Sequence, residues 1–436
     1  MKLLVFAHTP SPYYGQSYMV QLMLAGFGGD QRHPKTTGST GSAGISAGEA
    51  ASFGIECYHV NVRLSQKLED IGDLRIGKFI LLLGYCLQAI WCRVRYGVTT
   101  LYYIPAPGKR SALYRDWMVM FLCRFAFKRV ILHWHAAGLA KWLETVVQMR
   151  SRALTYRLMK QVDLSIVLSK YNRADAEKIF SRRIKIVGNG IPDPCPRFAA
   201  EVLPRRQARF AARQKLLAGR PLEDADLRDT GADPQIVTVL YLAHCTREKG
   251  LFDTVTAVIT ANQRLATRKS PLALRLLVTG TFVNAQEKAE FEQLVAQSGA
   301  AGLVQYMGFV SGERKNELLR NSDLFCFPTY YANENQPVNL IEAMAFGLPI
   351  LTSRWRSIPE LFPIHYPGLV DVRSPDQIAD AILALLTTES GEGFRAIFLR
   401  DFTLQRHLAG LAEAFHQAAQ SGESPAPTAA LGAFPT

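Results

Sequence analysis

The sequence predicts an α/β protein built from two doubly wound, Rossmann-like domains that face a central cleft. The first indication is a rhythm in which short apolar segments, typical of buried strands, alternate with helical segments, as in parallel sheets covered by helices. The second is a break in this rhythm after residue 190 and its return at Gln235. The third is length, because 436 residues are too many for one hydrophobic core and suit two domains.

The first domain is expected over residues 1–190. Lys2–His8 is a short buried strand that leads into a loop and a helix beginning near Ser17. Residues 28–51 are rich in Gly, Ser, Thr and Ala, a composition typical of a flexible loop. Further strands are predicted in the segments TTLYYIP, KRVILHWH and VDLSIVLS, separated by helices.

Residues 191–234 are expected to form a basic linker or insertion. Prolines at positions 192, 194 and 196 begin it, and residues 197–220 indicate a basic helix, either solvated on the surface or in contact with anionic lipid. The second domain is predicted over residues 235–390, with strands in IVTVLYLA, LALRLLVTG, LVQYMGFV, DLFCFPTYY and PILTS. We expect C-terminal helices over residues 391–416, which could pack back on the first domain. A disordered tail is predicted for residues 417–436.

The composition narrows the class of partner. A formal net charge of +13 attracts nucleic acid, anionic lipid or phosphorylated ligands. The basic residues are not interleaved with stacking aromatics as in nucleic-acid modules, so a membrane surface or a phosphate-bearing ligand is the better candidate. Seven cysteines show no CxxC pair and no metal-ligand spacing, which favours reduced thiols, a cytoplasmic location and no metal site.

Neither a signal peptide nor a membrane span is expected. The N-terminal apolar run is too short for a signal peptide and leads directly into loop residues. The longest apolar candidate, residues 79–92, is interrupted by Gly84 and Gln88. It is shorter than a bilayer requires, and we interpret it as a packed core helix.

Glu342 is the first candidate functional residue, because it interrupts an apolar helix predicted over about Pro337–Phe346. Pro337 suits the first turn of a helix, and Gly347 followed by a proline is a typical stop signal. A buried carboxylate is costly unless hydrogen-bond donors satisfy it. A salt bridge to an arginine elsewhere and the hydroxyls of a ligand are both open as the source of those donors.

Other candidates follow predicted strands of the second domain. Arg247 and Lys249 come after the first strand, Gly280 after the second and Glu334 after DLFCFPTYY. Ligands of open α/β sheets bind at these carboxyl ends, where a cation and a helix N-terminus can neutralise a diphosphate. The sequence contains no H-E-x-x-H, no P-loop and no G-x-G-x-x-G fingerprint in its first loop.

Taken together, these motifs resemble the retaining glycosyltransferases of family 4, of the "glycosyl transferase group 1" type, which have the two-domain GT-B fold. Glu334 and Glu342 match the family's E-x(7)-E pair, and EAMAFGLPIL matches the run that follows it. Lys249–Gly250 matches the phosphate-binding lysine and its glycine, and Asn189–Ile191 the end of the first domain. The segments SPYYGQSYM, LYRD and ILHWHAAGL resemble bacterial members that build exopolysaccharide or other surface glycans.

The resemblance implies a metal-independent transfer of a sugar from a nucleotide-sugar donor to a glycan or lipid-linked sugar acceptor, with no cofactor and no nucleic acid. Lys249 would stabilise the diphosphate leaving group, Glu342 would accept hydrogen bonds from the ribose and Glu334 would reach the donor sugar. The rest of the implied donor site, with the base near residues 309–310, comprises Arg247, His244, Asn335, Gln336, Val338, Gly280 and Val310.

His135 is expected to act near the reacting carbon, with His133, placed on the acceptor side, as the alternative. Gly15 is assigned to the acceptor side, as is Asp116, for which an N-cap or salt-bridge role is equally open. His244 stands where many family members have an arginine, and Arg247 is the expected substitute. The resemblance also implies a peripheral position on the inner face of the cytoplasmic membrane. Residues 91–97 and 123–129 combine basic and aromatic side chains, and both lipid contact and ordinary core packing with the cations exposed are open for them.

Two other functions are compatible with the architecture. A nucleotide-sugar epimerase of GT-B architecture would need an acid and a base on both sides of the sugar, and only the histidines are available for that. A non-catalytic scaffold would not need to retain Lys249, Glu334 and Glu342, because buried charges are costly to keep.

Overall fold

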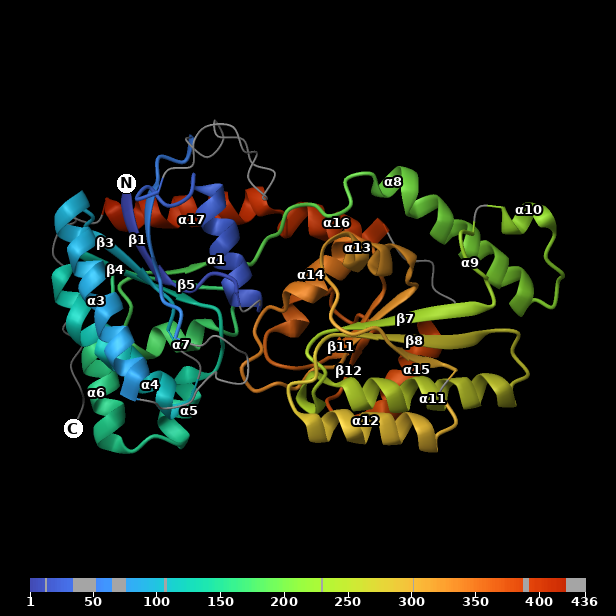
Figure 1. Ribbon diagram of the computed structural model, residues 1–436. Helices are drawn as coiled ribbons and strands as arrows, with labels where there is room; N and C mark the ends of the chain where they lie inside the picture. Colours follow the sequence, from blue (N-terminus) through green and yellow to red (C-terminus); the bar gives the residue numbers. More distant parts are fainter. Residues whose placement is uncertain are drawn as a thin grey trace, which may run out of the picture.

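The computed structural model describes residues 1–11, 14–33, 52–64, 76–105, 108–228, 230–300, 302–386 and 392–420. Two α/β domains lie side by side, each built on a six-stranded sheet (Figure 1). Every pair of neighbouring strands in both sheets is parallel. The predicted pair of doubly wound domains is therefore confirmed. The predicted flexible loop from residue 34 onward and the tail from residue 421 lie outside the described residues.

The sheet of the N-terminal domain has the order β2-β1-β3-β4-β5-β6. The order reverses between β1 and β3, so the loops that follow these two strands open the crevice where ligands of such sheets bind. The sequence analysis did not predict β2, which carries polar residues, or β6, which has only three residues. The strands are β1 (Lys2–Ala7), β2 (Glu56–Asn61), β3 (Thr100–Tyr103), β4 (Arg129–Trp134), β5 (Leu164–Val167) and β6 (Ile184–Ile186).

Helices cover both faces of this sheet, because alternate residues of its strands are apolar on both sides. Leu3 and Val5 of β1 belong to one hydrophobic cluster, and Leu4 and Phe6 to another. Helix α1 packs on the first face, and α3 and α4 on the second, where α4 also contacts α6. The helices are α1 (Gly15–Gly26), α3 (Ile76–Tyr96), α4 (Arg110–Cys123), η1 (Arg124–Ala126), α5 (Leu139–Thr145), α6 (Met149–Met159) and α7 (Arg173–Lys178).

The sheet of the C-terminal domain has the order β12-β11-β10-β7-β8-β9, with the reversal between β7 and β10. This is the strand order of dinucleotide-binding folds, and it places the loops after β7 and β10 side by side at the crevice. The two-residue β12 is too short to predict from a pattern. The strands are β7 (Ile236–Leu242), β8 (Ala273–Thr279), β9 (Val304–Tyr306), β10 (Leu324–Phe327), β11 (Ile350–Ser353) and β12 (Leu369–Val370).

Helices α11 and α15 pack against each other below this sheet in the view of Figure 1, and α13 and α14 lie above it. Pro337 is the N-cap of α14 rather than its first helical residue, and Gly347 ends the helix with a positive φ of 61°. The helices are η2 (Arg247–Lys249), α11 (Leu251–Thr267), α12 (Ala285–Gln297), α13 (Gly312–Asn321), α14 (Val338–Ala345), η3 (Ile358–Leu361), α15 (Pro375–Leu385) and α16 (Glu392–Asp401).

The basic insertion is folded against the C-terminal domain as α8 (Phe198–Glu201), α9 (Leu203–Leu217) and α10 (Asp224–Leu227). The expected solvated helix is wrong for one face of α9, where Arg206, Arg209 and Arg213 are buried. Asp323 pairs with Arg209 at 3.0 Å and with Arg213 at 2.9 Å. Burial and the charge of Arg209 lower the pKa of Arg206 to about 9.

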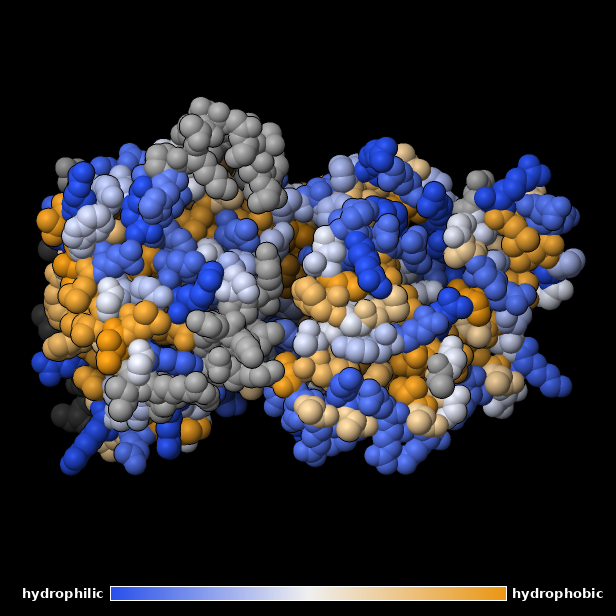
Figure 2. Space-filling model, in the orientation of Figure 1, coloured by the Kyte–Doolittle hydropathy of each residue, from blue (hydrophilic) through white to orange (hydrophobic). Residues whose placement is uncertain are grey.

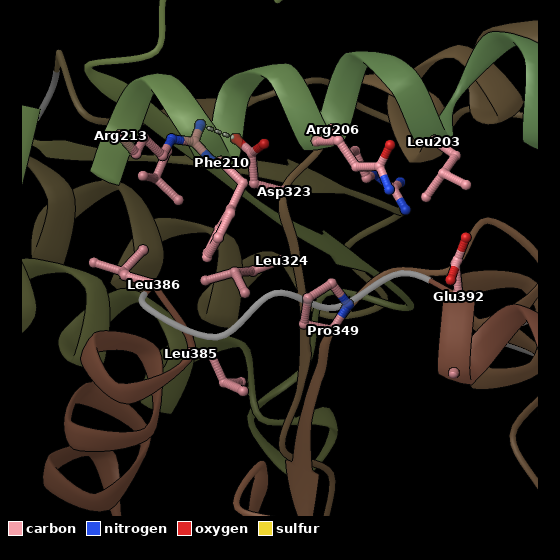
Figure 3. A pocket seen from close by; sticks show the side chains of 13 residues that line it. Leu203, Arg206, Phe210, Arg213, Asp323, Leu324, Pro349, Leu385, Leu386 and Glu392 are labelled. Atoms are coloured by element: carbon pink, nitrogen blue, oxygen red, sulfur yellow. Dashed lines mark hydrogen bonds and ion pairs between the residues drawn. The ribbon is translucent and has the colours of Figure 1, made fainter. Parts of the chain in front are cut away.

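These arginines hold α9 to the ends of other elements. Arg206 donates to the carbonyl oxygens of Leu319 and Phe346, which end α13 and α14, and so satisfies carbonyl groups that no helix partner can reach. A cavity of about 310 Å³ lies between α9 and the amino ends of the strands, with the Arg213–Asp323 pair on its wall (Figure 3). Because ligands of such sheets bind at the opposite, carboxyl ends of the strands, we assign this cluster a role in stability.

The last described helix, α17 (Leu404–Ala419), returns to the N-terminal domain and packs on α1 and β5 (Figure 1). Its residues Leu404 and Leu408 join the hydrophobic cluster that contains Leu3. The backbone of Ile191 is hydrogen-bonded to the segment that enters α17. One continuous hydrophobic cluster therefore links the two domains.

Helix α3 differs from its prediction as a packed core helix. Only one side of it is buried, and its opposite side exposes large apolar residues. Within the described part of the chain, the segment Gly77–Tyr96 of α3 is the one helix long and apolar enough to cross a membrane, by length and composition alone.

Candidate functional site

A cleft of about 1610 Å³ lies between the two domains, and the carboxyl ends of both sheets open into it. This is the place where open α/β sheets bind ligands. Most residues predicted to bind the donor or acceptor line it, although they come from loops far apart in the sequence. These are Gly15, His135, His244, Lys249, Gly280, Val310, Glu334, Asn335, Gln336, Val338 and Glu342.

Lys249 and Glu334 meet at the strand-order reversal of the C-terminal domain. Lys249 ends η2 after β7, and Glu334 lies in the loop after β10. Their side chains form an ion pair with 2.6 Å between Nζ and Oε2, and both are mostly buried. Thr329 donates a hydrogen bond of 3.1 Å to the same carboxylate, and the Lys249 ammonium lies 4.5 Å from the centre of the Tyr331 ring. The pair thus holds a positive and a negative group, both partly exposed to the cleft, in fixed positions.

Glu342 is buried on α14, as predicted, and its partner is a lysine. Nζ of Lys315, on α13, lies 2.5 Å from Oε1 of Glu342, and both residues line the cleft. The expected salt bridge therefore exists, but with a lysine rather than an arginine. It does not close off the carboxylate, because Glu342 still faces the space where a ligand would lie.

Two glycines allow neighbouring loops to approach each other closely, backbone to backbone, at the carboxyl end of the C-terminal sheet. Gly280, after β8, has a φ of 140°, and a Cβ atom there would lie 1.7 Å from the carbonyl oxygen of Ala243. Gly250, after Lys249, has a φ of 81°, and its Cβ would lie 2.4 Å from the carbonyl oxygen of Pro328. A larger residue at either position would push these loops apart, because its Cβ would collide with a backbone carbonyl group, which cannot move aside as a flexible side chain can.

The two residues expected to support Lys249 are placed differently. His244 lines the cleft, and burial together with the charge of Lys249 lowers its pKa. Arg247 instead forms a 2.6 Å ion pair with Glu290 on α12 and stacks on the ring of Phe252. Arg247 is absent from the described lining of the cleft. The expectation that it replaces a phosphate-binding arginine is not met by this geometry.

His133 lies within β4, and His135 directly follows the last residue of that strand. His135 lines the cleft, and its Nε2 is buried with no hydrogen-bond partner among the described residues. His133 is fully buried behind it, with Nδ1 2.6 Å from the hydroxyl of Tyr102. The ring centres of the two histidines are 4.2 Å apart. His135 is therefore the histidine available to a ligand, and His133 belongs to the core rather than to the predicted acceptor side.

A third histidine, His407 of α17, completes this buried cluster. Its ring lies 6.4 Å from that of His133, and its Nδ1 is 2.6 Å from the carbonyl oxygen of Gly188. Burial, and then the charge of His407, lower the pKa of His135 to about 3. Burial lowers the pKa of His407 to about 4 and that of His133 well below its usual value. All three rings are consequently neutral at neutral pH.

The side chains of Asn335 and Gln336 connect the two domains. Asn335 donates a 2.7 Å hydrogen bond to the side chain of Asn172 at the start of α7. Gln336 accepts a hydrogen bond from the backbone of Asn189, whose side chain donates back to the carbonyl oxygen of Gln336 at 3.0 Å. The sequence analysis assigned Asn335 and Gln336 of this loop to the donor site. The structure adds that its side chains hold the N-terminal domain against the site.

On the acceptor side, Asp116 does not line the cleft but supports residues that do. It is fully buried, accepts a 2.5 Å hydrogen bond from the hydroxyl of Tyr103 and pairs with Arg115 at 3.1 Å. Tyr103 and Arg115 line the cleft, as Gly15 does. The salt-bridge alternative for Asp116 therefore describes its position better than a direct contact with an acceptor.

Sequence reasoning missed several residues that line the cleft. Lys315 gave no signal, because α13 reads as an ordinary charged surface helix. Asn339 donates a 2.9 Å hydrogen bond to the carbonyl oxygen of Leu242, and its side-chain oxygen is buried without a partner among the described residues.

Among the described residues, no group of three or more His, Cys, Asp or Glu side chains is placed to hold a metal ion. All seven cysteines are free.

The fold and the cleft define a GT-B protein, and comparison with known proteins supports this class. Residues 223–396 match the family described as "Glycosyl transferases group 1". The resemblance to that group is therefore confirmed for the part of the chain that carries Lys249, Glu334 and Glu342. The N-terminal domain lies outside the match.

Among individual proteins, the chain is 27% identical over 189 residues to the amylovoran biosynthesis glycosyltransferase AmsK of Erwinia amylovora, covering 39% of this chain and 44% of that protein. The aligned part thus spans less than half the length of this relative. The sucrose-phosphate synthase of Thermosynechococcus elongatus has a similar structure, with a TM-score of 0.62 at 17% identity, over 97% of this chain and all of that one. HepE of Anabaena in complex with UDP gives a TM-score of 0.57 at 12% identity, over 96% and 100% of the two chains.

Proposed function

We propose that the protein is a retaining glycosyltransferase that moves a sugar from a nucleotide-sugar donor to a glycan or lipid-linked sugar acceptor in surface polysaccharide biosynthesis. The observation that carries this proposal is that Lys249, Glu334 and Glu342 all line the same cleft. These side chains come from η2, the loop after β10 and α14, and only the folded domain brings them together. Relatives named for the biosynthesis of amylovoran and O-antigen chains support the biological setting.

The geometry is suited to a donor whose negative charge increases during reaction. Lys249 would shift part of its interaction from Glu334 to the diphosphate leaving group, which stabilises charge that grows in the transition state. Glu342 would accept hydrogen bonds from both ribose hydroxyls, and Glu334 would accept them from the sugar. His135, neutral at neutral pH because burial lowers its pKa, would donate or accept a hydrogen bond near the anomeric carbon without adding charge.

We further propose that the transfer requires no metal ion and no cofactor. Lys249 supplies the positive charge that a divalent ion would otherwise supply at the diphosphate. The proposed location is the cytoplasm, with a peripheral position on the inner face of the cytoplasmic membrane, because a lipid-linked acceptor would be presented there. The retaining, family 4 mechanism is part of the same proposal.

A transfer assay tests the function directly. Nucleotide sugars are first screened by thermal shift for those that stabilise the protein, and the best donor is then incubated with lipid-linked sugar acceptors. The proposal expects a glycosylated product whose anomeric configuration, determined by NMR, equals that of the donor. If the nucleotide sugar is recovered with one hydroxyl inverted and no sugar is transferred to the acceptor, the protein is an epimerase. If the protein binds no nucleotide at all, the result favours a scaffold.

A further inference from the structure

Helix α3 carries apolar residues on two opposite sides. The inner stripe packs on β1, β2 and α4 and consists of Leu82, Cys86, Ala89 and Cys92. The outer stripe recurs at helical spacing on the other side and consists of Ile80, Leu83, Leu87, Trp91 and Val94. Ile80 is 68% exposed and Val94 74% exposed. A helix on the surface of a domain normally presents polar residues on that side.

The neighbouring helix continues this apolar surface. Tyr114 and Phe121 on α4 and Phe125 on η1 are exposed, with Phe125 82% exposed. Helices α3 and α4 contact each other, and we call the exposed apolar residues of α3, α4 and η1 together the α3–α4 surface. Figure 2 shows hydrophobic side chains gathered over α3 on the outer side of the N-terminal domain. Apolar patches of this kind mark sites of interaction with another molecule.

The charge of this region indicates the kind of partner. Residues 76–129 contain nine Lys and Arg residues and a single acidic residue, Asp116. Asp116 is buried and paired with Arg115, so it does not offset the cations outside. Arg95, next to Val94, and Lys128, close to Phe125, are exposed. Apolar residues with Trp and Tyr among them, flanked by cations, are typical of a surface that lies in the headgroup region of an anionic membrane.

We propose that the α3–α4 surface seats the N-terminal domain on an anionic phospholipid bilayer. Helix α3 lies along the membrane rather than across it, because its inner stripe is part of the domain core and removing it would expose that core. Trp91, Phe121 and Phe125 enter the apolar boundary of the bilayer, and the flanking cations meet the lipid phosphates.

The same two helices lead to the cleft. Lys78 and Phe79, near the start of α3, line the cleft, as do Lys109, which precedes α4, and Ser111 and Arg115 within α4. Docking through the α3–α4 surface therefore brings the mouth of the cleft next to the bilayer, where a lipid-linked acceptor can enter without leaving the membrane. This orientation rests on the proposed function. The docking itself does not, because it requires no sugar.

Vesicle co-sedimentation tests the docking. The full chain is mixed with vesicles of phosphatidylcholine alone or with phosphatidylglycerol added. We expect binding to the anionic vesicles only, and release as salt is raised, since surface charges are screened. Leu87→Glu and Val94→Glu should each weaken partitioning by about tenfold, because each removes a buried apolar side chain from the bound state. Ile364→Glu, at an 88% exposed position of the C-terminal domain, is the matched control and should bind like the wild type.

Fluorescence gives an independent measurement. Brominated lipids should quench part of the tryptophan emission, and Trp91→Phe should remove most of that quenching. Failure of the wild type to bind anionic vesicles, or undiminished binding by Leu87→Glu, would overturn the proposal. A wild-type dimer that Val94→Glu converts to a monomer, without vesicle binding, would instead identify a protein interface. Thermal shifts caused by nucleotides, measured on the same variants, report on the cleft alone. A protein that binds nucleotide but not vesicles would contradict the docking surface and leave the transferase assignment standing.

Discussion

Lys315 and Glu342 form an ion pair across the C-terminal half of the cleft, with 2.5 Å between the ammonium and the carboxylate. The lysine comes from α13 and the glutamate from α14, so the pair joins two helices at the wall of the proposed donor site. Glu342 consequently has a protein partner in addition to the proposed ribose. Two roles, structural and ligand-binding, are combined in one residue, and they can be separated by experiment.

Glu342→Ala should weaken nucleotide binding by about 1–3 kcal/mol, because the hydrogen bonds from the ribose to a charged group are lost. Lys315→Met removes the other member of the pair but leaves the carboxylate, so its effect on affinity should be smaller. Calorimetric titration of both variants with the donor nucleotide measures the difference. Equal affinity of Glu342→Ala and wild type would show that the carboxylate serves only the ion pair.

Lys249→Ala should lower kcat by about a hundredfold or more, with a smaller effect on donor affinity, because the lysine acts on charge that develops in the transition state. Steady-state kinetics with the identified donor provide the measurement. Lys288→Ala, which removes one partner of an exposed ion pair with Glu292, is the control and should leave kcat unchanged. Activity should also persist in EDTA, and a strict requirement for a divalent ion would contradict the metal-free mechanism.

The free energy of unfolding should fall as pH is lowered below about 6.5. The folded-state pKa values of His135 and His407, about 3 and about 4, lie below the 6.5 of an unfolded histidine. Between these values the unfolded chain binds more protons, so each histidine contributes a slope of up to about 1.4 kcal/mol per pH unit. Urea unfolding at a series of pH values measures this slope.

The pH dependence can be assigned to the cluster with a matched pair of variants. His407→Gln should reduce the slope, because one buried ring is removed. Substitution of His365, an exposed histidine, by Gln should leave the slope unchanged. Identical slopes in both variants would place the pH dependence elsewhere in the molecule.

Asp323→Asn should destabilise the protein by about 3–5 kcal/mol, because it leaves the buried Arg209 and Arg213 without their carboxylate. Asp376→Asn breaks an exposed ion pair with Arg264 and should cost less than about 1 kcal/mol. Urea unfolding compares the two. Similar small losses would mean that the backbone carbonyl partners of the arginines are sufficient to hold α9.

The features predicted from the sequence were those that depend on local pattern. Buried strands such as β7 and β10 appear as apolar runs, and the position of Glu334 and Glu342 after them follows from the rule that sites form at the carboxyl ends of parallel strands. Their placement in one cleft with Lys249 agrees with the prediction. The sequence pattern could not indicate the partner of Glu342, because Lys315 lies on a separate helix and its pairing depends on how α13 and α14 pack.

The structure differs from the prediction at three places, in each case because the sequence pattern does not show which side of an element is buried or which partner a side chain meets. The row Arg206, Arg209 and Arg213 resembles a solvated basic face, and only the packing of α9 on Asp323 and on helix ends shows that it is buried. Helix α3 resembles a core helix because both of its sides are apolar. Arg247 lies close to Lys249 in sequence, but the turn of η2 directs it to Glu290.

The return of α17 to the N-terminal domain affects how the chain acquires its structure during synthesis. The apolar face of α1 is covered by a helix made long after it, once the entire C-terminal domain has been translated. Domains otherwise tend to fold in order as they leave the ribosome. Here the N-terminal domain remains incomplete, with part of its core exposed, until residues 404–419 emerge. A fragment that stops at residue 190 would therefore lack part of its own core, and the two domains cannot be separated by a single cut in the chain.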